Sequence, residues 1–210
     1  EVHVIHSDIR DVTAEQILPY IPSDGVDLVT SGMPCETFST AGNSSRAAYD
    51  DRQFLFREGI RIAQIANARM ILFENVPMIT TKRVAKTSKK LVLDVMKKEL
   101  IEAGYGNFKQ FIIDAEKYGV PQKRKRFFLL ASRNPDDEIT APEITTTKEV
   151  TVREAFCDIP PVVANTWTEN PMYLSETSEY TRLMRDDTFW RRKTKENKLL
   201  NHLPMNHRAY

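Results

Sequence analysis

The segment from Ser31 to Ser39, Ser-Gly-Met-Pro-Cys-Glu-Thr-Phe-Ser, constrains the fold more than any other stretch of this chain. It follows Val26 to Val29, a short apolar, β-branched run of the kind that forms a buried strand. Gly32 ends the run and Pro34 fixes the backbone, so Cys35 emerges at the carboxyl end of the predicted strand. Ligands of open α/β sheets bind at that edge. Cys35 is therefore either a nucleophile or, as free cysteines usually are, a small buried apolar residue.

Acidic side chains follow two further predicted strands. Residues 2–6 alternate like a strand and lead into Asp8, which is either an acceptor for a nucleotide-like ligand or an aspartate that caps a turn. Residues 70–73 are wholly apolar and run directly into Glu74. A carboxylate beside a buried strand can hold or share a proton near neutral pH, whereas the alternative is a salt bridge near a helix start.

Basic residues gather in two places. Gln122-Lys123-Arg124-Lys125-Arg126 leads into the apolar strand at 127–131, and the planar guanidinium of arginine suits carbonyls and phosphates. An exposed turn explains the two lysines of this run better than its arginines, which a strand would point to one face. The second run, residues 82–90, is typical of a solvated face. Residues 189–193 combine aromatic and basic side chains, which can bind nucleic acid.

Composition describes an ordinary globular protein of 210 residues with a net charge of +1, so it does not by itself indicate a nucleic-acid partner. The two cysteines, Cys35 and Cys157, form no disulfide framework, and Cys157 falls on a short predicted helix where we expect a structural role. The four histidines form no zinc-like spacing, and no apolar run reaches the length of a membrane span. We therefore expect a protein of a reducing cytoplasm without a metal or a membrane partner.

Three of these segments resemble motifs of the cytosine-5 DNA methyltransferases. The segments are similar, in order and approximate spacing, to that family's Pro-Cys, Glu-Asn-Val and Gln-x-Arg-x-Arg motifs: Pro34-Cys35 with Phe38-Ser39, Glu74-Asn75-Val76, and residues 122–126. Supporting matches are Ser7-Asp8-Ile9, Asp51-Arg52 with Leu55-Phe56, and residues 151–155. The resemblance covers about residues 1 to 160. It implies an α/β fold, a partial Rossmann-like sheet of an S-adenosylmethionine-dependent methyltransferase, with helices on both faces and a polar C-terminal extension. The strands are expected near Val2, Leu28, Ile71, Phe111 and Phe128.

The resemblance also implies a reaction. Cys35 would add to carbon 6 of a flipped-out cytosine, and Glu74 would protonate N3 of that base or hydrogen-bond to it strongly. Arg126 would hold O2 of the base, with Arg124 supporting the site. Carbon 5 would then take a methyl group from S-adenosylmethionine. Residues 40–51 would form a lid over the base.

The same resemblance implies the cofactor contacts. Asp8 would accept a hydrogen bond from the adenine amine, Ile9 would pack on the adenine ring, and Pro34 and Leu55 would line the rest of the pocket. The partners implied are double-stranded DNA and S-adenosylmethionine. The protein is expected to be a monomer in the cytoplasm of a bacterial or phage-infected cell and to belong to a restriction-modification system.

The sequence departs from the family at both ends. The glycine-rich Phe-x-Gly-x-Gly cofactor motif and the closing Gly-Asn-Ser-Val motif are missing, and Glu36 stands where glutamine is commoner. We therefore expect the chain to begin near the third strand of the family's sheet, with an incomplete catalytic core at 1–160, and a linker with the start of a target-recognition region at 161–210. Such a piece is expected to be inactive alone.

Two other functions stay open. An RNA cytosine-5 methyltransferase is less favoured, because the sequence lacks the Cys-Phe-Thr stretch of that branch. A non-catalytic DNA-binding or regulatory module would keep the core without the cofactor loop. Thymidylate synthase also uses a Pro-Cys nucleophile, but the two partner motifs argue against it.

Overall fold

The computed structural model describes residues 2–34, 51–146, 148–161 and 172–186. The chain divides into two compact units, which are described separately: unit 1 contains residues 1–114 and 124–143, and unit 2 contains residues 115–123 and 144–210. This division does not test the domain boundary expected at residue 160, which stays a prediction.

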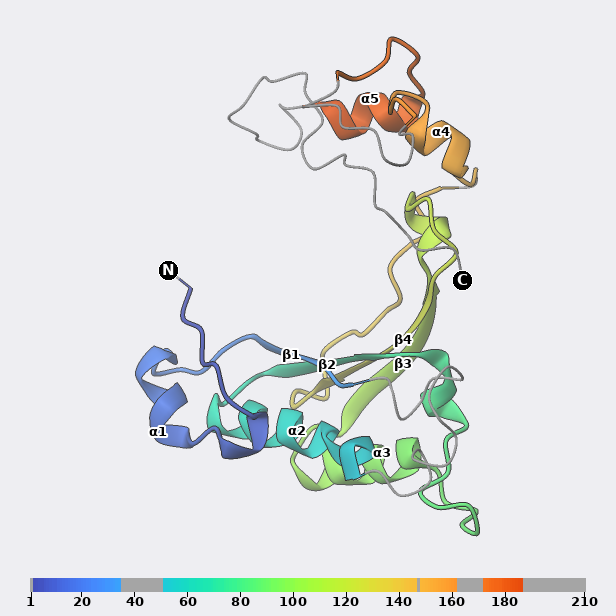
Figure 1. The fold of residues 1–210 in the computed structure, drawn as a ribbon. Helices are drawn as coiled ribbons and strands as arrows, with labels where there is room; N and C mark the ends of the chain where they lie inside the picture. Colours follow the sequence, from blue (N-terminus) through green and yellow to red (C-terminus); the bar gives the residue numbers. More distant parts are fainter. Residues whose placement is uncertain (1, 35–50, 147, 162–171, 187–210) are drawn as a thin grey trace, which may run out of the picture. The chain divides into compact units, whose positions relative to one another are not determined.

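Unit 1 is built on a four-stranded mixed sheet (Figure 1). Its strands are β1 (Leu28–Gly32), β2 (Met70–Asn75), β3 (Asn107–Asp114) and β4 (Lys125–Ser132), in the spatial order β1-β2-β4-β3. Strands β1 and β2 are parallel, and β4 runs antiparallel to both of its neighbours. The carboxyl ends of β1 and β2 therefore lie at the same edge of the sheet as the first residues of β4. Four of the expected strands are confirmed.

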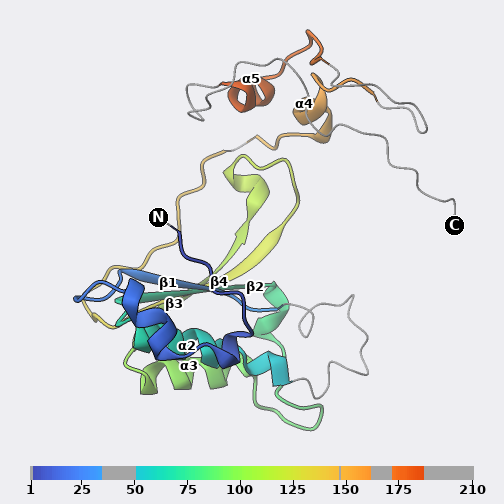
Figure 2. The same cartoon turned by 60° about the vertical axis from the view of Figure 1, so that its left-hand side comes forward.

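Two amphipathic helices, α2 (Phe56–Ile65) and α3 (Val92–Glu102), lie on the same face of the sheet in both ribbon views (Figures 1 and 2). Each helix connects two parallel strands, and both connections advance across the sheet in the same direction, from β1 to β2 and from β2 to β3. Because such crossovers are right-handed, both helices must cover one face. Helices were expected on both faces; in the described part of the chain α2 and α3 share one.

The core of unit 1 lies between these helices and the sheet. Its fully buried side chains alternate along β2 and β4 and meet one stripe of each helix, as amphipathic periodicity requires. They include Phe56, Ile71, Phe73, Met96, Leu100, Phe127 and Leu129. Tyr105 is also fully buried, and its hydroxyl donates to the carbonyl of Ala68 at 2.9 Å. This hydrogen bond satisfies a phenol that would otherwise be costly to bury.

Shorter elements complete the described residues. They are η1 (Ile9–Asp11), α1 (Ala14–Ile17), η2 (Leu18–Tyr20), η3 (Asp51–Phe54), η4 (Pro77–Thr80), η5 (Ala115–Tyr118), α4 (Val152–Phe156) and α5 (Glu179–Arg185). The strand expected at residues 2–6 is wrong, because these residues form no ladder with another described strand and Val2 and Val4 are exposed. Alternating apolar residues make a strand only when a neighbouring backbone takes up their hydrogen bonds.

Gly59 on α2 allows the helix to approach the sheet closely. A Cβ added there would lie 2.8 Å from Oγ of Ser31 and 2.9 Å from a ring carbon of Phe73. We expect Gly59→Ala to lower the free energy of unfolding by about 1–3 kcal/mol, because overpacking outweighs the better helix propensity of alanine. Urea denaturation measures this change. Gly106→Ala is the control, since a Cβ there meets nothing within 4 Å, and equal destabilisation of both variants would contradict the packing argument.

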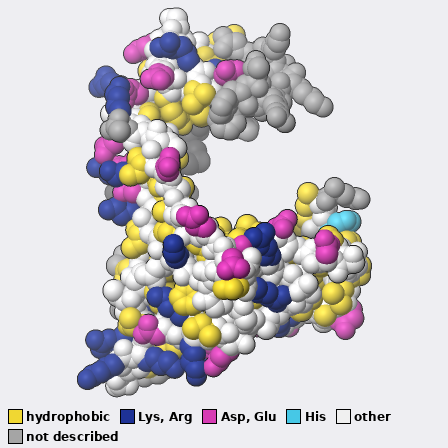
Figure 3. Space-filling view, turned by 180° about the vertical axis from the view of Figure 1, so that it is seen from behind, with side chains coloured by type: hydrophobic (Ala, Val, Ile, Leu, Met, Phe, Trp, Pro, Cys, Tyr) yellow, Lys and Arg dark blue, Asp and Glu magenta, His cyan; other side chains and the backbone are white. Residues whose placement is uncertain are grey.

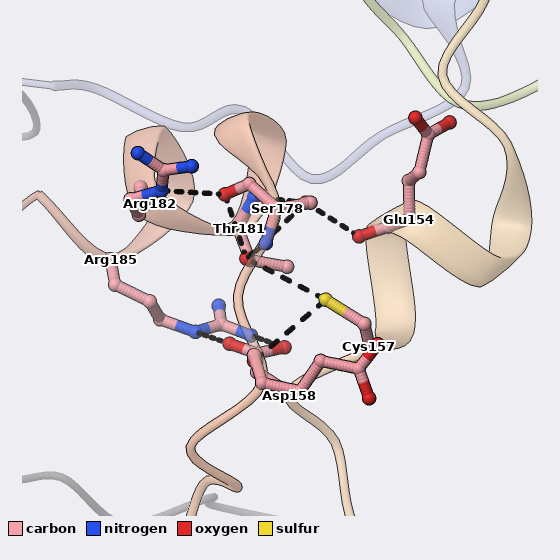
Figure 4. A network of polar contacts seen from close by, with 8 residues as sticks. Glu154, Cys157, Asp158, Ser178, Thr181, Arg182 and Arg185 are labelled. Atoms are coloured by element: carbon pink, nitrogen blue, oxygen red, sulfur yellow. Dashed lines mark hydrogen bonds and ion pairs between the residues drawn. The ribbon is translucent and has the colours of Figure 1, made fainter.

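Unit 2 contains α4 and α5, which a polar network joins (Figure 4). The Ser178 hydroxyl donates to the carbonyl of Glu154 at 2.7 Å, and Arg185 forms a two-pronged ion pair with Asp158, whose side chain is 3% exposed. Cys157, at the end of α4, lies 3.8 Å from the carbonyl of Glu176 and 3.9 Å from the Thr181 hydroxyl. These contacts agree with the structural role expected of Cys157. Helix α5 was not expected from the sequence.

Candidate active site

Glu74 and Arg126 form an ion pair at the carboxyl edge of the sheet, with 2.8 Å between Oε1 and Nε. Glu74 ends the apolar part of β2 and its register partner on β4 is Phe128, so Arg126 is the diagonal neighbour on the same face. The side chains are 39% and 22% exposed, so Glu74 is more open to solvent than the apolar strand before it predicts. A carboxylate and a guanidinium held side by side at a strand edge can offer an acceptor and a planar donor to one small polar ring.

The segment that leads to Cys35 lies directly beside Glu74. Gly32, the last residue of β1, is the register partner of Glu74, and Met33 and Pro34 continue the chain. Asn75 holds this segment: its side chain is 1% exposed and donates from Nδ2 to the carbonyl of Met33 at 3.4 Å. Cys35 lies outside the described residues, and so do residues 40–50 of the lid expected at 40–51 and the aromatic and basic segment at 189–193.

A cavity of about 520 Å³ opens on the other side of the same segment. Its walls come from β1, from the first turns of α2 and from the turn at 8–10. All four residues expected to contact the cofactor are among its lining residues: Asp8, Ile9, Pro34 and Leu55. Gly32, Met33 and Pro34 line this cavity as well, so one short segment separates it from Glu74.

The Asp8 carboxylate accepts hydrogen bonds from the backbone and the guanidinium of Arg10, at 2.9 Å from N and Nε and 2.6 Å from Nη2. These hydrogen bonds hold the pKa of Asp8 well below its usual range, so the carboxylate is charged throughout the neutral range. Asp8 also caps η1, which was the alternative reading of this residue. A ligand that needs Asp8 as an acceptor must share it with Arg10 or displace that guanidinium.

Arg61 on α2 fixes the turn that carries Asp8. Its guanidinium donates to the carbonyl of Val12 at 2.8 Å and to the carbonyl of Ile9 at 2.7 Å, while Nε pairs with Glu58 at 2.7 Å. Sequence reasoning missed both Arg61 and the contact of Asn75. Each bond joins a side chain to a backbone carbonyl at least 42 residues away, and no local pattern encodes such a contact.

Arg124 precedes β4 and is exposed. Because the strand begins at Lys125, Arg124 lies outside it, and the strand alternation that would point both arginines to one face does not apply. Within the described residues, no hydrogen bond or ion pair joins Arg124 to another side chain. Its supporting role stays a prediction.

The described ranges contain neither a cluster of metal-ligand residues nor a helix that could span a membrane. No three His, Cys, Asp or Glu residues of that part of the chain gather as metal ligands would. None of its helices combines the length and the apolar character that crossing a membrane requires.

Comparison with known proteins identifies the family. The family profile of C-5 cytosine-specific DNA methylases matches residues 2–206. The Type II methyltransferase M1.HphI of Haemophilus parahaemolyticus is 31% identical over 173 residues, which cover 82% of this chain and 44% of that protein. M.FnuDI of Fusobacterium nucleatum is 38% identical over 130 residues, covering 62% of this chain and 34% of the relative. The chain thus spans less than half the length of these curated relatives.

Solved structures agree on the fold. A DNA modification methyltransferase encoded within an E. coli prophage superposes with a TM-score of 0.54 at 20% identity, covering 80% of this chain and 45% of that one. The Entamoeba histolytica methyltransferase EhMeth gives a TM-score of 0.50 at 16% identity, over 89% of this chain and 51% of the other. The sheet of unit 1 is thus a Rossmann-like methyltransferase sheet, and the chain belongs to the C-5 cytosine-specific DNA methylase family.

Proposed function

We propose that this chain is the catalytic part of a DNA (cytosine-5)-methyltransferase that forms a covalent adduct through Cys35. One observation carries the proposal: the segment from Gly32 to Pro34 lines the cavity and, at Gly32, pairs with Glu74, which in turn forms the ion pair with Arg126. A residue that follows Pro34 therefore starts from a point between a ligand cavity and a pair of groups suited to a pyrimidine. This arrangement is what transfer between a cofactor and a base requires.

The cavity suits S-adenosylmethionine in its size and in its lining. Its volume falls within the range of small-molecule sites, and its walls are apolar apart from a few polar groups. Ile9 and Leu55 can pack against an adenine ring. Asp8 can accept a hydrogen bond from an exocyclic amine once the Arg10 guanidinium releases one of its carboxylate oxygens. When bound, S-adenosylmethionine supplies an electrophilic methyl group.

The residues of this chain prepare the base for that methyl group. The Cys35 thiolate adds to carbon 6 of cytosine, which pushes electrons toward N3 and makes carbon 5 nucleophilic. Glu74 supplies a proton or a strong hydrogen bond at N3, and Arg126 donates to O2. After methylation, water takes the proton on carbon 5, and the electron pair of that bond forms the double bond between carbon 5 and carbon 6 and expels the Cys35 sulfur as a thiolate. Any proton held at N3 returns to Glu74, which restores the aromatic ring. Arg124 supports the site from the position just before β4.

The proposed DNA partner is double-stranded, and its target cytosine must leave the helix. Carbon 5 and carbon 6 of a stacked base cannot meet a thiolate and a methyl donor on opposite faces of the ring. Residues 40–51 are the proposed lid over the extruded base.

The test is methyl transfer by the full-length product of this reading frame. The protein is incubated with labelled S-adenosylmethionine and unmethylated duplex DNA, and the nucleosides are separated after digestion. We expect label in 5-methyldeoxycytidine, and none from these 210 residues alone, because the glycine-rich cofactor motif is not among them. Label in another nucleoside, transfer to RNA only, or no transfer by the full-length protein would contradict the proposal.

Arg61 offers a test of the cofactor cavity alone. Arg61→Met removes both hydrogen bonds to the turn that carries Asp8, so we expect the KM for S-adenosylmethionine to rise about tenfold, a change of about 1.4 kcal/mol in binding. The value of kcat should change little, because Glu74 and Arg126 are untouched. Arg57→Met is the control, since Arg57 lies one turn earlier on α2 and pairs with Glu99 away from the cavity. The same KM in both variants would remove Arg61 from cofactor binding.

A further inference from the structure

Residues 82–91 form a short hairpin, here called the basic hairpin, between η4 and α3. The amide of Val92 donates to the carbonyl of Lys82 at 2.9 Å, and the amide of Val84 donates to the carbonyl of Lys90 at 3.0 Å. Arg83 and Leu91 form an antiparallel β-bridge. The turn is closed by the Ser88 hydroxyl, which accepts from the amide of Lys90 at 3.0 Å. The hairpin therefore has a defined backbone structure.

Charge is concentrated on this hairpin. It carries five cations, Lys82, Arg83, Lys86, Lys89 and Lys90, and no Asp or Glu occurs between Glu74 and Asp94. Because the whole chain has a net charge of only +1, the remainder of the chain is net acidic. Arg83, Lys86, Lys89 and Lys90 are exposed, and the described residues provide no carboxylate partner for these four. Figure 3 shows dark blue side chains gathered at the lower edge of the molecule, where this segment lies.

The neighbouring helix α3 carries charges of both signs, and there Lys98 pairs with Glu102 at 3.5 Å. Positive charges that are gathered without nearby carboxylates repel one another, and a bound polyanion relieves this repulsion by neutralising them.

The hairpin is anchored close to the candidate active site. Gln53, which is 4% exposed, donates from Nε2 to the carbonyl of Val84 at 3.2 Å and so ties the hairpin to η3. At its other end the hairpin follows η4, whose Ile79 is fully buried and which packs on β4 and α3. Since η4 begins three residues after Glu74, the hairpin extends from the carboxyl edge of the sheet that carries the Glu74–Arg126 pair (Figure 1).

We propose that the basic hairpin is a docking surface for the phosphate backbone of duplex DNA beside the target cytosine. The inference rests on the proposed function and names a surface that positions the duplex for it. Lysine and arginine contacts to phosphate fix the register of a protein on DNA without reading its sequence. A membrane partner fits less well, because a helix or loop that enters a membrane surface needs exposed aromatic or leucine side chains. The tip of this hairpin has none, and its apolar residues Val84 and Ala85 are half-buried.

The experiment measures binding of the full-length protein to a fluorescein-labelled DNA duplex by anisotropy, between about 50 and about 200 mM KCl. The test variant is Lys86→Gln/Lys89→Gln/Lys90→Gln. The control is Lys97→Gln/Lys98→Gln/Lys109→Gln, which removes the same number of charges from α3 and β3. We expect the slope of log K against log salt to become shallower by about 0.9 for each lysine that contacts a phosphate, and affinity at the lowest salt to fall at least about tenfold, in the test variant only.

Three results would overturn the inference: no binding of DNA by the unmodified protein, a wild-type slope in the test variant, or an equal change in the control. Loss of binding to phosphatidylserine vesicles with unchanged DNA binding would also overturn it in favour of a membrane. Because the readout is binding, it is independent of methyl transfer. A protein that binds DNA through the hairpin but transfers no methyl group would refute the proposed function and leave only the phosphate-docking role of the hairpin standing.

Discussion

Cys35→Ala in the full-length protein should abolish the covalent complex that forms with duplex DNA containing 5-fluorocytosine. Fluorine at carbon 5 cannot leave as a proton, so the proposed sequence stops after methyl transfer with sulfur still bonded to carbon 6. The complex is then stable to denaturants and moves as a single shifted band on a denaturing gel. Without the thiolate there is no bond at carbon 6, and we expect the band to fall below detection.

The chain offers a matched control, because it has only one other cysteine. Cys157 lies in unit 2 between the carbonyl of Glu176 and the Thr181 hydroxyl, so Cys157→Ala should leave the shifted band at wild-type intensity. If the band survives in Cys35→Ala and disappears in Cys157→Ala, the nucleophile is Cys157 and the proposed site is wrong. Binding of the unfluorinated duplex by Cys35→Ala should be retained, which separates loss of chemistry from loss of DNA binding.

The sequence predicts four strands of unit 1 well, because each is encoded locally. The apolar runs that contain Leu28, Ile71, Phe111 and Phe128 all lie in strands. The position of β4 between β2 and β3 is not encoded in any one segment, since it depends on which backbone pairs with which. The same limit explains why the strand predicted at residues 2–6 is wrong: the alternation is local, but no described strand pairs with this backbone.

The sequence likewise indicates residues of the candidate site but not all of the contacts between them. Motif resemblance indicates Glu74 and Arg126, and strand register brings them into contact because β2 and β4 are antiparallel. It also indicates Asp8, Ile9, Pro34 and Leu55, which line one cavity although they come from three separate segments. The pairing of Asp8 with Arg10 and the hold of Arg61 on the turn are products of side-chain geometry. Neither leaves a periodic signal in the sequence.

Glu74→Gln should slow methyl transfer by about 10²–10⁴-fold in kcat while the KM for S-adenosylmethionine stays near its wild-type value. Glutamine keeps the size of the side chain and can still contact the ring, but it cannot deliver a proton to N3 when sulfur adds to carbon 6. Glu74 is not among the residues that line the cofactor cavity, so cofactor binding should persist. Single-turnover kinetics with labelled S-adenosylmethionine measures the rate, and a titration of the cofactor measures KM.

The substitution also breaks the ion pair with Arg126, and this second effect needs its own control. Glu99→Gln removes a comparable pair, the one with Arg57 at 2.7 Å on the helix face of unit 1, without touching the carboxyl edge of the sheet. If loss of an ion pair were sufficient to slow the enzyme, both variants would slow alike. A large loss of rate in Glu74→Gln with a wild-type rate in Glu99→Gln assigns the effect to the carboxyl group at N3, whereas equal rates in Glu74→Gln and the wild type would exclude that role.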